Sequence, residues 1–319
     1  MVAQRRIIGA TDNKLRRTFV GTILNEPMPS LNIAIVGVGQ IGSTFAYKLA
    51  RAGHRVTAVA RPGSDRLLQL RTNGGILLST GELAEVDITD TLDESVEYDL
   101  IIVTTRDDHV DAVLQALRRS CAKAIQFMFV SFDPERLILA VGSGRSSLGM
   151  PIVMASLDDR GRLTHTILKR PTLHGDRRWV DLFIKAGLPS RFEENMSLWL
   201  RCQVPFAVAM ECISVFAVRR EASARWGQSM AVAKSFLAAG RIIKARGEAL
   251  YPRSKRVMNN LPIFVLALLF RGVSGIKSLR NVLAQGEDEA RALIDKVAAA
   301  AIGIPSLSHE VELVKAVRP

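Results

Sequence analysis

Residues 33–42 read IAIVGVGQIG, and this stretch decides the fold of the chain. Four apolar residues run directly into three glycines with the spacing G-x-G-x-x-G. A helix-compatible segment, residues 43–52, follows at once, and a second apolar strand comes at residues 55–60. The order is strand, glycine turn, helix and strand. This order predicts a βαβ unit that binds a dinucleotide.

Each glycine of the turn has a separate role in such a unit. Gly37 permits the tight turn, Gly39 lets the backbone approach a pyrophosphate, and Gly42 allows the helix to pack closely on the strand. The amides at the start of the helix, beginning at Gln40 and Ile41, offer unpaired donors and the positive end of the helix dipole. The alternative interpretation is a glycine turn that binds no ligand.

The composition is that of a globular chain with about two domains in its 319 residues. Hydrophobic residues make up 48% and charged residues 23%. The three cysteines show no metal-ligand spacing and no disulfide framework, which favours reduced thiols in a cytoplasmic protein. The longest apolar run, residues 261–270, has about half the length that a bilayer requires, so we expect a buried helix and no membrane contact.

The net charge of +12 is concentrated in the C-terminal half. Residues 201–280 contain fourteen Lys and Arg residues and three Glu residues. One interpretation is nucleic-acid binding. However, the basic residues lack interleaved aromatics and a known nucleic-acid motif. Solvated helix faces, together with a field that attracts anionic ligands, are therefore favoured, and we expect no nucleic-acid partner.

The residue after the second strand indicates which dinucleotide is bound. An enzyme that uses NAD usually has an acidic residue there, which binds the ribose 2′-hydroxyl. This chain has Arg61, with Arg66 nearby. A guanidinium suits a 2′-phosphate, because it forms paired, charge-assisted hydrogen bonds. NADP(H) is therefore the expected cofactor, and a plain surface role for Arg61 is the alternative.

Further strands and helices complete the predicted N-terminal domain. Residues 99–104 form an apolar strand that ends at Thr105 and Arg106, and ligands bind beyond the carboxyl ends of such strands. A helix over residues 107–120 follows. The other strands are expected at residues 76–79, 84–88, 124–130, 152–155 and 163–168.

The pattern changes to helical from about Arg177, and no strand is expected after it. Long helices are expected at residues 196–224, 229–246, 262–270 and 287–301. The predicted fold is a doubly wound parallel Rossmann sheet followed by an all-α domain. Residues 1–30 are expected to be a disordered extension, residues 31–170 the NADP-binding domain, and residues 171–319 the helical domain for substrate and dimerisation.

The order of these features resembles the ketopantoate reductase family over nearly everything after residue 30. Thr104-Thr105-Arg106 is similar to the family's strand end of Val/Thr-x-Lys. Trp199-Leu-Arg201 lies where the family has Trp-x-Lys at the start of a long helix. Glu287, sixteen residues before Gly303-Ile-Pro305, matches the spacing of the family's helical Glu. Residues 161–166 and 173–175 resemble the family's segment between domains.

The resemblance implies hydride transfer from NADPH to the keto carbon of a 2-keto acid, with a Lys as the proton donor. At this Lys position the chain has Arg201, and the two following Asn positions hold Pro205 and Ala209. The family's Asn-Gly turn corresponds to Ser131-Phe132. Arginine stays protonated and is a poor acid, although it can polarise a carbonyl or clamp a carboxylate.

We therefore expect a divergent, NADPH-dependent reductase that acts on a 2-keto acid or a related small anionic carbonyl compound, with a homodimer formed through the helical domain. Ketopantoate is one candidate substrate, and another carbonyl compound is the alternative. Arg201 would bind or polarise the substrate and Glu287 would position it, although a solvated helix start explains Glu287 equally well. The alternative function is a non-catalytic NADP-binding sensor or scaffold. His109 is a lesser candidate for the acid. The expected cofactor-binding residues are Gly37, Gly39, Gln40, Ile41, Gly42, Arg61, Thr105, Arg106 and Ser131.

Overall fold

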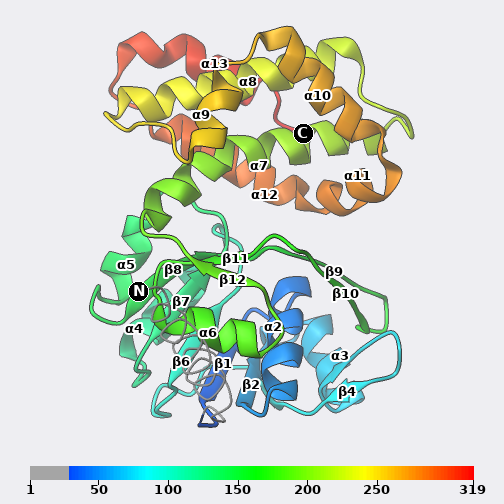
Figure 1. Ribbon diagram of the computed structural model, residues 1–319, viewed down its shortest axis with the longest axis vertical. Coiled ribbons are helices and arrows are strands. Elements are labelled where there is room, and N and C mark those ends of the chain that lie inside the picture. Colours follow the sequence, from blue (N-terminus) through cyan, green and yellow to red (C-terminus); the bar gives the residue numbers. More distant parts are fainter. Residues whose placement is uncertain (1–28) are drawn as a thin grey trace, which may run out of the picture. The chain divides into compact units, whose positions relative to one another are not determined.

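The strand that precedes the glycine turn lies inside a mainly parallel sheet of eight strands in the computed structural model (Figure 1). The strands are β1 (Asn32–Val36), β2 (Arg55–Val59), β5 (Asp87–Thr89), β6 (Leu100–Val103), β7 (Ile125–Met128), β8 (Ser146–Met150), β11 (Thr172–His174) and β12 (Ser190–Phe192). Their order in the sheet is β12-β11-β8-β7-β6-β1-β2-β5. Within it, β11 pairs antiparallel with β8, and the other pairs are parallel.

The strand order reverses at β1, whose two neighbours are β2 and β6. Ligands of open α/β sheets bind at such a switch point, beyond the carboxyl ends of the strands. The central strand β6 presents apolar side chains to both faces of the sheet. The four residues of β6, LIIV, are all buried, as a parallel sheet covered by helices requires. The covering helices are α2 (Gln40–Arg51), α3 (Asp65–Asn73), α4 (Asp111–Arg119), α5 (Glu135–Val141) and α6 (Arg178–Lys185).

Two small antiparallel pairs accompany the main sheet. One pair joins β3 (Ile76–Leu77) to β4 (Leu83–Ala84), and the other joins β9 (Val153–Leu157) to β10 (Leu163–Ile167). The β9–β10 pair packs against α2. The segment that resembles the family's connection between domains therefore lies against the helix that follows the glycine turn.

The C-terminal region is helical, and this confirms the predicted fold class. Its helices are α7 (Met196–Val218), α8 (Trp226–Ala245), α9 (Arg253–Asn259), α10 (Ile263–Gly275), α11 (Lys277–Leu283), η1 (Ala284–Gly286), α12 (Glu287–Ala299), η2 (Pro305–Leu307) and α13 (Ser308–Lys315). Helix α7 continues through Pro205. By length and composition α7 could cross a membrane, but 67% of its most apolar window is buried, as in a core helix.

Three expectations about elements were wrong. The strand β12 follows Arg177, where we expected none, and β8 was missed. The apolar run at residues 261–270 enters helix α10 as expected, but the helix is not buried on all sides, because Phe264, Leu268 and Leu269 are each at least half exposed.

The structure describes residues 29–319. The expectation of a disordered extension concerns residues 1–30, and all but the last two of these lie outside the described part. Residues 32–319 form one compact unit, so the division at residue 170 stays a prediction.

Candidate functional site

The glycine turn has the geometry that its spacing predicts. Gly37 has a φ of +90°, which favours glycine, and a Cβ there would lie 2.8 Å from Cγ2 of Thr105. A Cβ on Gly42 would lie 2.3 Å from the carbonyl oxygen of Gly37, so α2 could not pack as closely with any larger residue. These two glycines are required by contacts inside the chain.

Gly39 differs, because nothing in the described chain lies within 4 Å of the Cβ it lacks. Its φ of −75° suits any residue. Gly39 is the N-cap of α2, no side chain caps this end, and the Gly39 carbonyl accepts from the amide of Ser43 at 2.9 Å. The first amides of α2 are therefore left for another partner, as in phosphate-binding turns.

A pocket of about 870 Å³ opens beside this turn, at the carboxyl ends of β1, β2 and β6. It is large enough for a dinucleotide. Five of the predicted cofactor-binding residues line it: Gly37, Gly39, Arg61, Thr105 and Arg106. Gln40, Ile41 and Gly42 lie in the first turn of α2, Ser131 follows β7, and none of the four lines the pocket.

The two arginines after β2 have different roles. Arg66 is anchored: Nε donates to the carbonyl of Val38 at 2.9 Å, and its terminal nitrogens donate to Ser43 Oγ at 2.9 Å and to the carbonyl of Gly161 at 2.8 Å. Burial lowers the pKa of Arg66 to about 10. Arg61 is exposed on the pocket wall, and its side chain has no polar partner within residues 29–319. Arg61 is therefore free to bind an anion.

Two buried hydroxyls at neighbouring strand ends have no partner among the described residues. They are Thr105 Oγ1, after β6, and Ser131 Oγ, after β7. A buried unpaired polar atom is costly, and such atoms are expected where a ligand supplies the missing hydrogen bond. Both residues were predicted from the sequence to contact the cofactor.

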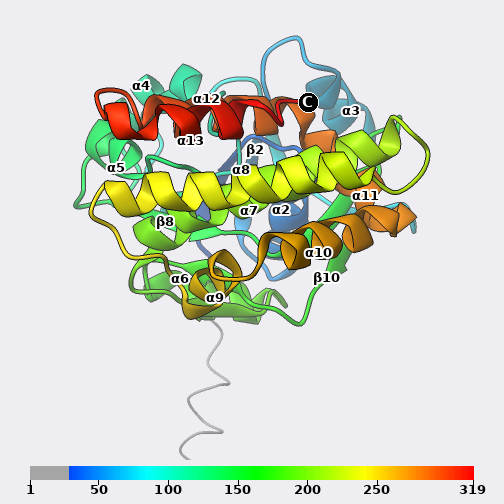
Figure 2. The same cartoon turned by 90° about the horizontal axis from the view of Figure 1, so that it is seen from above.

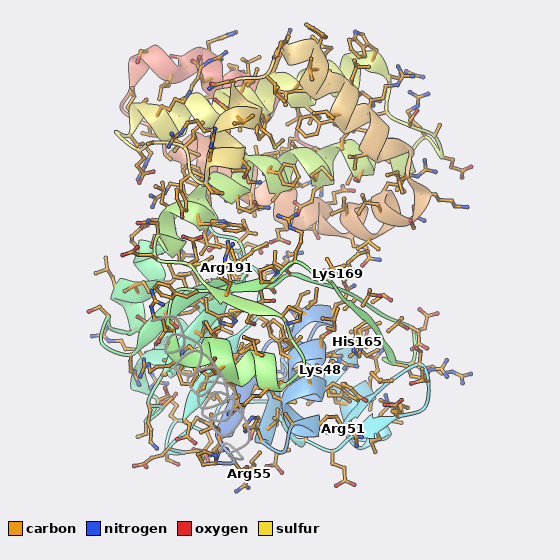
Figure 3. All side chains as sticks on the ribbon, in the orientation of Figure 1. Lys48, Arg51, Arg55, His165, Lys169 and Arg191 are labelled. Atoms are coloured by element: carbon orange, nitrogen blue, oxygen red, sulfur yellow. The ribbon has the colours of Figure 1, made fainter. Side chains whose placement is uncertain are left out.

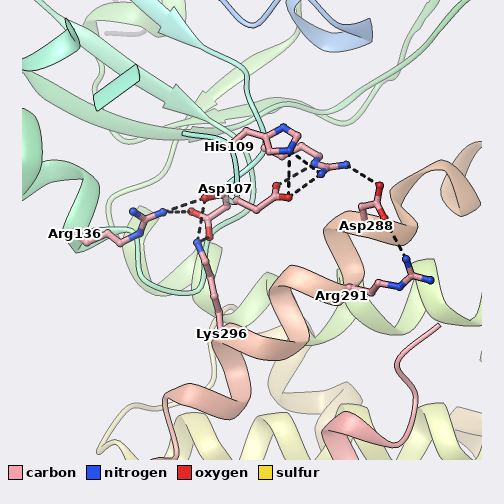
Figure 4. Close-up of polar contacts among 8 residues, drawn as sticks. Asp107, His109, Arg136, Asp288, Arg291 and Lys296 are labelled. Atoms are coloured by element: carbon pink, nitrogen blue, oxygen red, sulfur yellow. Dashed lines mark hydrogen bonds and ion pairs between the residues drawn. The ribbon is translucent and has the colours of Figure 1, made fainter. Parts of the chain in front are cut away.

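An ion-pair network joins the β6–α4 loop to α12 next to this pocket (Figure 4). Asp107, whose side chain is 3% exposed, binds Arg136 at 3.1 Å and pairs with Lys296. Arg106 binds Asp108 at 2.7 Å and lies 4.0 Å from Asp288. Ion pairs therefore connect the β6–α4 loop, which forms one wall of the pocket, to helix α12.

A comparison with known protein families finds a match to the N-terminal part of the chain. Residues 33–169 match the model of the family "Ketopantoate reductase PanE/ApbA". Over these residues the chain is similar to the ketopantoate reductase family. The resemblance inferred from the sequence is thereby confirmed. The chain has no significant match among curated proteins.

Solved structures show that the ketopantoate reductase fold extends over most of the chain. A PanE/ApbA family ketopantoate reductase from Ralstonia eutropha JMP134 has a TM-score of 0.66 and 17% identity, covering 90% of this chain and 98% of that one. A D-mandelate dehydrogenase with NADH and anilino(oxo)acetate has a TM-score of 0.62 and 15% identity over 90% and 97%. A dimeric ketopantoate reductase from Staphylococcus aureus has a TM-score of 0.59 and 14% identity over 90% and 99%. At these identities the likeness shows the fold alone.

Arg201, at the family's Lys position, lies outside the lining of the cofactor pocket. Its Nε donates to the carbonyl of Phe132 at 2.8 Å, and its two terminal nitrogens pair with Glu135 and Glu248. The side chain is 5% exposed. It borders a second, open cavity of about 940 Å³ between α5 and the start of α7.

Glu287, the other predicted catalytic residue, begins α12. Its carboxylate accepts from Arg219 at 2.7 Å and from Arg291. The structure does not bring Glu287 into contact with Arg201. It does bring the nearby Gln285 to the glycine turn, because Gln40 Nε2 donates to Gln285 Oε1 at 2.7 Å. The two predicted catalytic residues therefore occupy separate ion pairs.

A pair of carboxyl groups near the start of α12, Glu211 and Glu289, was not predicted from the sequence. Glu211 of α7 has a buried Oε2 that finds no hydrogen-bond partner among residues 29–319, and its side chain packs against Gly286. Burial, and then the charge of Glu289, raise the pKa of Glu211 well above its ordinary value, while Arg106 opposes this. Burial likewise raises the pKa of Glu289. Glu211 lies ten residues after Arg201 in an apolar helix, and an acid in such a helix was the available signal.

The histidines have different surroundings. His174 is fully buried, and its Nδ1 and Nε2 lie 3.0 Å from Gln126 and 3.2 Å from Ser190. Figure 3 shows His165 among basic residues such as Lys48 and Lys169, and none of the three lines the cofactor pocket. His109 does line that pocket, and its Nε2 lies 3.2 Å from Arg106.

Proposed function

We propose that this chain is a nicotinamide-dependent reductase that transfers hydride to the carbonyl carbon of a 2-keto acid. The observation that carries the proposal is the glycine turn at the switch point of the sheet, whose Gly39 faces open space beside the 870 Å³ pocket. The family domain over residues 33–169 supports the same activity.

The residues present fit a nicotinamide dinucleotide. The first amides of α2 and the bare backbone at Gly39 would hold the pyrophosphate. Thr105 Oγ1 and Ser131 Oγ, which lack partners within the described part of the chain, would bind the nicotinamide end at β6 and β7. When bound, the reduced cofactor supplies a hydride to the carbonyl carbon.

We infer a preference for NADPH over NADH from Arg61. Its guanidinium is exposed on the pocket wall and is free of ion pairs in residues 29–319, so a 2′-phosphate could take up its charge-assisted hydrogen bonds. Asp90 also lines the pocket, but Arg71 binds its carboxylate at 3.3 Å. The D-mandelate dehydrogenase structure contains NADH, so this fold does not by itself require NADPH.

The substrate would be a small anionic carbonyl compound. The chain has a net charge of +12, and this field attracts anions. The mandelate dehydrogenase structure holds anilino(oxo)acetate, an oxo acid. Arg201 would clamp or polarise the substrate, and Glu287 would position it. To contact the substrate, each side chain would give up one of its two ion pairs within the chain.

Reduction of a carbonyl also needs a proton, and Arg201 is a poor donor because arginine stays protonated. Glu211 is better suited, since its raised pKa keeps it protonated at pH values where an exposed glutamate is ionised. Glu289 shares this environment beside Arg106. We propose that this pair of carboxyl groups, Glu211 and Glu289, supplies the proton for the reaction.

A second candidate function is a non-catalytic NADP-binding sensor or scaffold. One observation favours it: both predicted catalytic residues are already paired, Arg201 with two glutamates and Glu287 with two arginines. Such a protein would keep the cofactor pocket and lack turnover.

Turnover assays separate the two functions. NADPH oxidation is followed by absorbance with a panel of 2-keto acids that includes ketopantoate and phenylglyoxylate. The reductase predicts turnover with at least one compound, and a loss of about tenfold or more in kcat/KM for Arg201→Ala, equal to about 1.4 kcal/mol of transition-state binding. Tight NADPH binding without turnover across the panel supports the sensor.

A further inference from the structure

Helix α10 has an apolar side that no part of the described chain covers. Its other side, which includes Leu266, packs against α8 and α7. Figure 2 shows α9 and α10 on one side of α8, with α13 on the other. The uncovered side carries four large apolar side chains. We call them the α10 outer face: Phe264, Leu268, Leu269 and Ile276, the last of which is the C-cap of the helix.

The exposure of the α10 outer face is high for side chains of this size. Phe264 is 55% exposed, Leu268 56%, Leu269 50% and Ile276 52%. Together they expose on the order of 400 Å² of apolar surface, which is as much as the largest patch on a typical monomer. Patches of this size are typical of surfaces that bind an apolar partner.

The spacing of these residues places them on the same side of the helix. Leu268 and Ile276 follow Phe264 by four and by twelve residues, and residues four apart are neighbours on a helix surface. Leu269 widens the row. Arg271, seven residues after Phe264, lies at the edge of the same side and is also exposed. The exposed side of α10 is therefore apolar with a cation at its edge.

Cations border the α10 outer face, and acids are missing from this part of the sequence. Residues 249–286 contain six Lys and Arg residues and no Asp or Glu. Arg253 begins α9, Arg271 lies in α10, and Lys277 follows Ile276. We call these three cations the basic rim. All three are exposed, and none forms an ion pair within residues 29–319.

The loop between α7 and α8 adds the same two kinds of side chain at the C-terminal end of α10. It contacts this end, because the amide of Ala224 donates to Ser274 Oγ at 3.0 Å. Arg225 is exposed, and Trp226, the first residue of α8, is 43% exposed. Glu221 is the one acid between residues 219 and 226. Tryptophan is enriched where proteins meet the membrane–water boundary, since its ring is apolar with one polar atom.

Apolar side chains bordered by cations fit the surface of an anionic membrane. The apolar side chains enter the boundary between head groups and acyl chains, and the cations attract anionic head groups. A nucleic acid would match the cations but would leave the four apolar side chains in water. A second copy would match the apolar side chains but would bring its own basic rim against the first, and like charges repel.

We propose that the α10 outer face and the basic rim dock this chain onto a membrane that contains anionic lipids. Helix α10 lies in the plane of the membrane, because its 13 residues are fewer than the about 20 that a span requires. Helix α9 does not extend it into a span, since the two helices are bent by 112°.

This docking corrects the expectation of no membrane contact. That expectation was based on the length of the apolar run at residues 261–270, and a peripheral contact does not depend on this length. The docking is independent of the proposed reductase activity, because no residue of the α10 outer face or the basic rim lines the cofactor pocket.

Vesicle flotation of the full chain tests the docking. The wild type is expected to bind vesicles of phosphatidylcholine with phosphatidylglycerol at least about tenfold more tightly than vesicles of phosphatidylcholine alone. Leu268→Asp should weaken this binding about tenfold or more, and Arg271→Gln about fivefold. Both variants should keep the wild-type melting curve, because both side chains are exposed. The matched control is Leu139→Asp on α5, since Leu139 is 81% exposed on another element, and it should bind like the wild type.

Tryptophan fluorescence tests which residues enter the membrane. In a Trp226→Phe background, which removes the half-exposed indole, the emission of Phe264→Trp should shift to shorter wavelength when phosphatidylglycerol vesicles are added. Leu139→Trp in the same background should show no shift. Equal shifts for the two variants would contradict docking through α10.

Three other results would overturn the proposal. The first is a wild-type chain that does not bind phosphatidylglycerol vesicles at low salt, whether or not it binds DNA. The second is a Leu268→Asp variant that binds them as tightly as the wild type. The third is a dimer in sedimentation velocity that Leu268→Asp dissociates while neither protein binds vesicles, which would assign the α10 outer face to a second copy.

Discussion

Arg61 and Arg66 are five residues apart, yet only one is available to a ligand. Arg66 donates hydrogen bonds to the carbonyls of Val38 and Gly161, so it joins the glycine turn to the turn between β9 and β10. Arg61 faces the pocket without a polar partner in the described residues. The sequence places both arginines near the cofactor. Which of them is free depends on long-range contacts, such as that with Gly161, and local patterns do not reveal these.

Replacing Arg61 tests the cofactor preference. We expect Arg61→Ala to weaken NADPH binding about 10- to 100-fold, because charge-assisted hydrogen bonds contribute about 1.5–3 kcal/mol. NADH binding should change less than twofold. Fluorescence titration of the variant with both cofactors measures this. Equal weakening for NADPH and NADH would contradict recognition of the 2′-phosphate.

Glu211 should make stability depend on pH. Its pKa is raised in the folded state, so the folded protein keeps a proton that the unfolded chain releases. The free energy of unfolding therefore falls as the pH rises above the ordinary glutamate value. We expect Glu211→Gln to gain about 1–2 kcal/mol at pH 8 and much less at pH 4.5, since the buried charge is removed. Urea unfolding at the two pH values checks this, and an equal gain at both would contradict it.

At the scale of elements, strong periodic patterns predicted the structure well. The glycine turn, α2, β2 and β6 formed close to their expected bounds, because apolar strands and glycine spacing are local signals. Strand β8, SSLGM, was missed because serine and glycine are poor strand formers. Gly149 is needed there, since a Cβ would lie 2.8 Å from the carbonyl oxygen of Leu173 in the neighbouring strand. Only the assembled sheet shows this requirement.

Two glycines of the turn form a matched pair for experiment. Gly42→Ala places a Cβ 2.3 Å from a backbone oxygen, so we expect it to destabilise the fold by about 2 kcal/mol or more. Gly39→Ala meets no atom of the described chain and should leave the melting temperature nearly unchanged. It should nevertheless weaken NADPH binding about tenfold or more, because the methyl group occupies the space of the pyrophosphate. Loss of stability in Gly39→Ala with unchanged binding would contradict these roles.

At the scale of the whole molecule, most residues expected on the cofactor side lie together around one pocket, whereas Arg201 and Glu287 lie in separate ion pairs. The cofactor side lies within one βαβ unit and the next strand, which periodicity places together. The substrate side depends on how α7 and α12 meet the sheet. Arg201 pairs with Glu135 and Glu248, which are 66 and 47 residues away in the chain. No local pattern gives such partners. The proximity of Glu211 to Glu289 was missed for the same reason.

The contact of Lys296 with Asp107 ties the cofactor-side loop to α12, 189 residues later. We expect Lys296→Met to cost about 2 kcal/mol, since the buried carboxylate of Asp107 then keeps only Arg136 as a cation. Lys277→Met on exposed α11 is the control and should change stability by less than about 0.5 kcal/mol. Chemical unfolding of both variants is the measurement. Equal effects would show that the network does not stabilise this junction.

Calorimetric titration of the full chain with NADPH is the decisive experiment for a nicotinamide dinucleotide site in residues 33–169. We expect saturable binding of one NADPH per chain, with a dissociation constant of about 1–100 µM. We also expect at least a tenfold loss of affinity for Gly39→Ala, a variant that still folds. Residues 33–169 do not bind such a cofactor if neither NADPH nor NADH gives any heat of binding at millimolar concentration and neither raises the melting temperature.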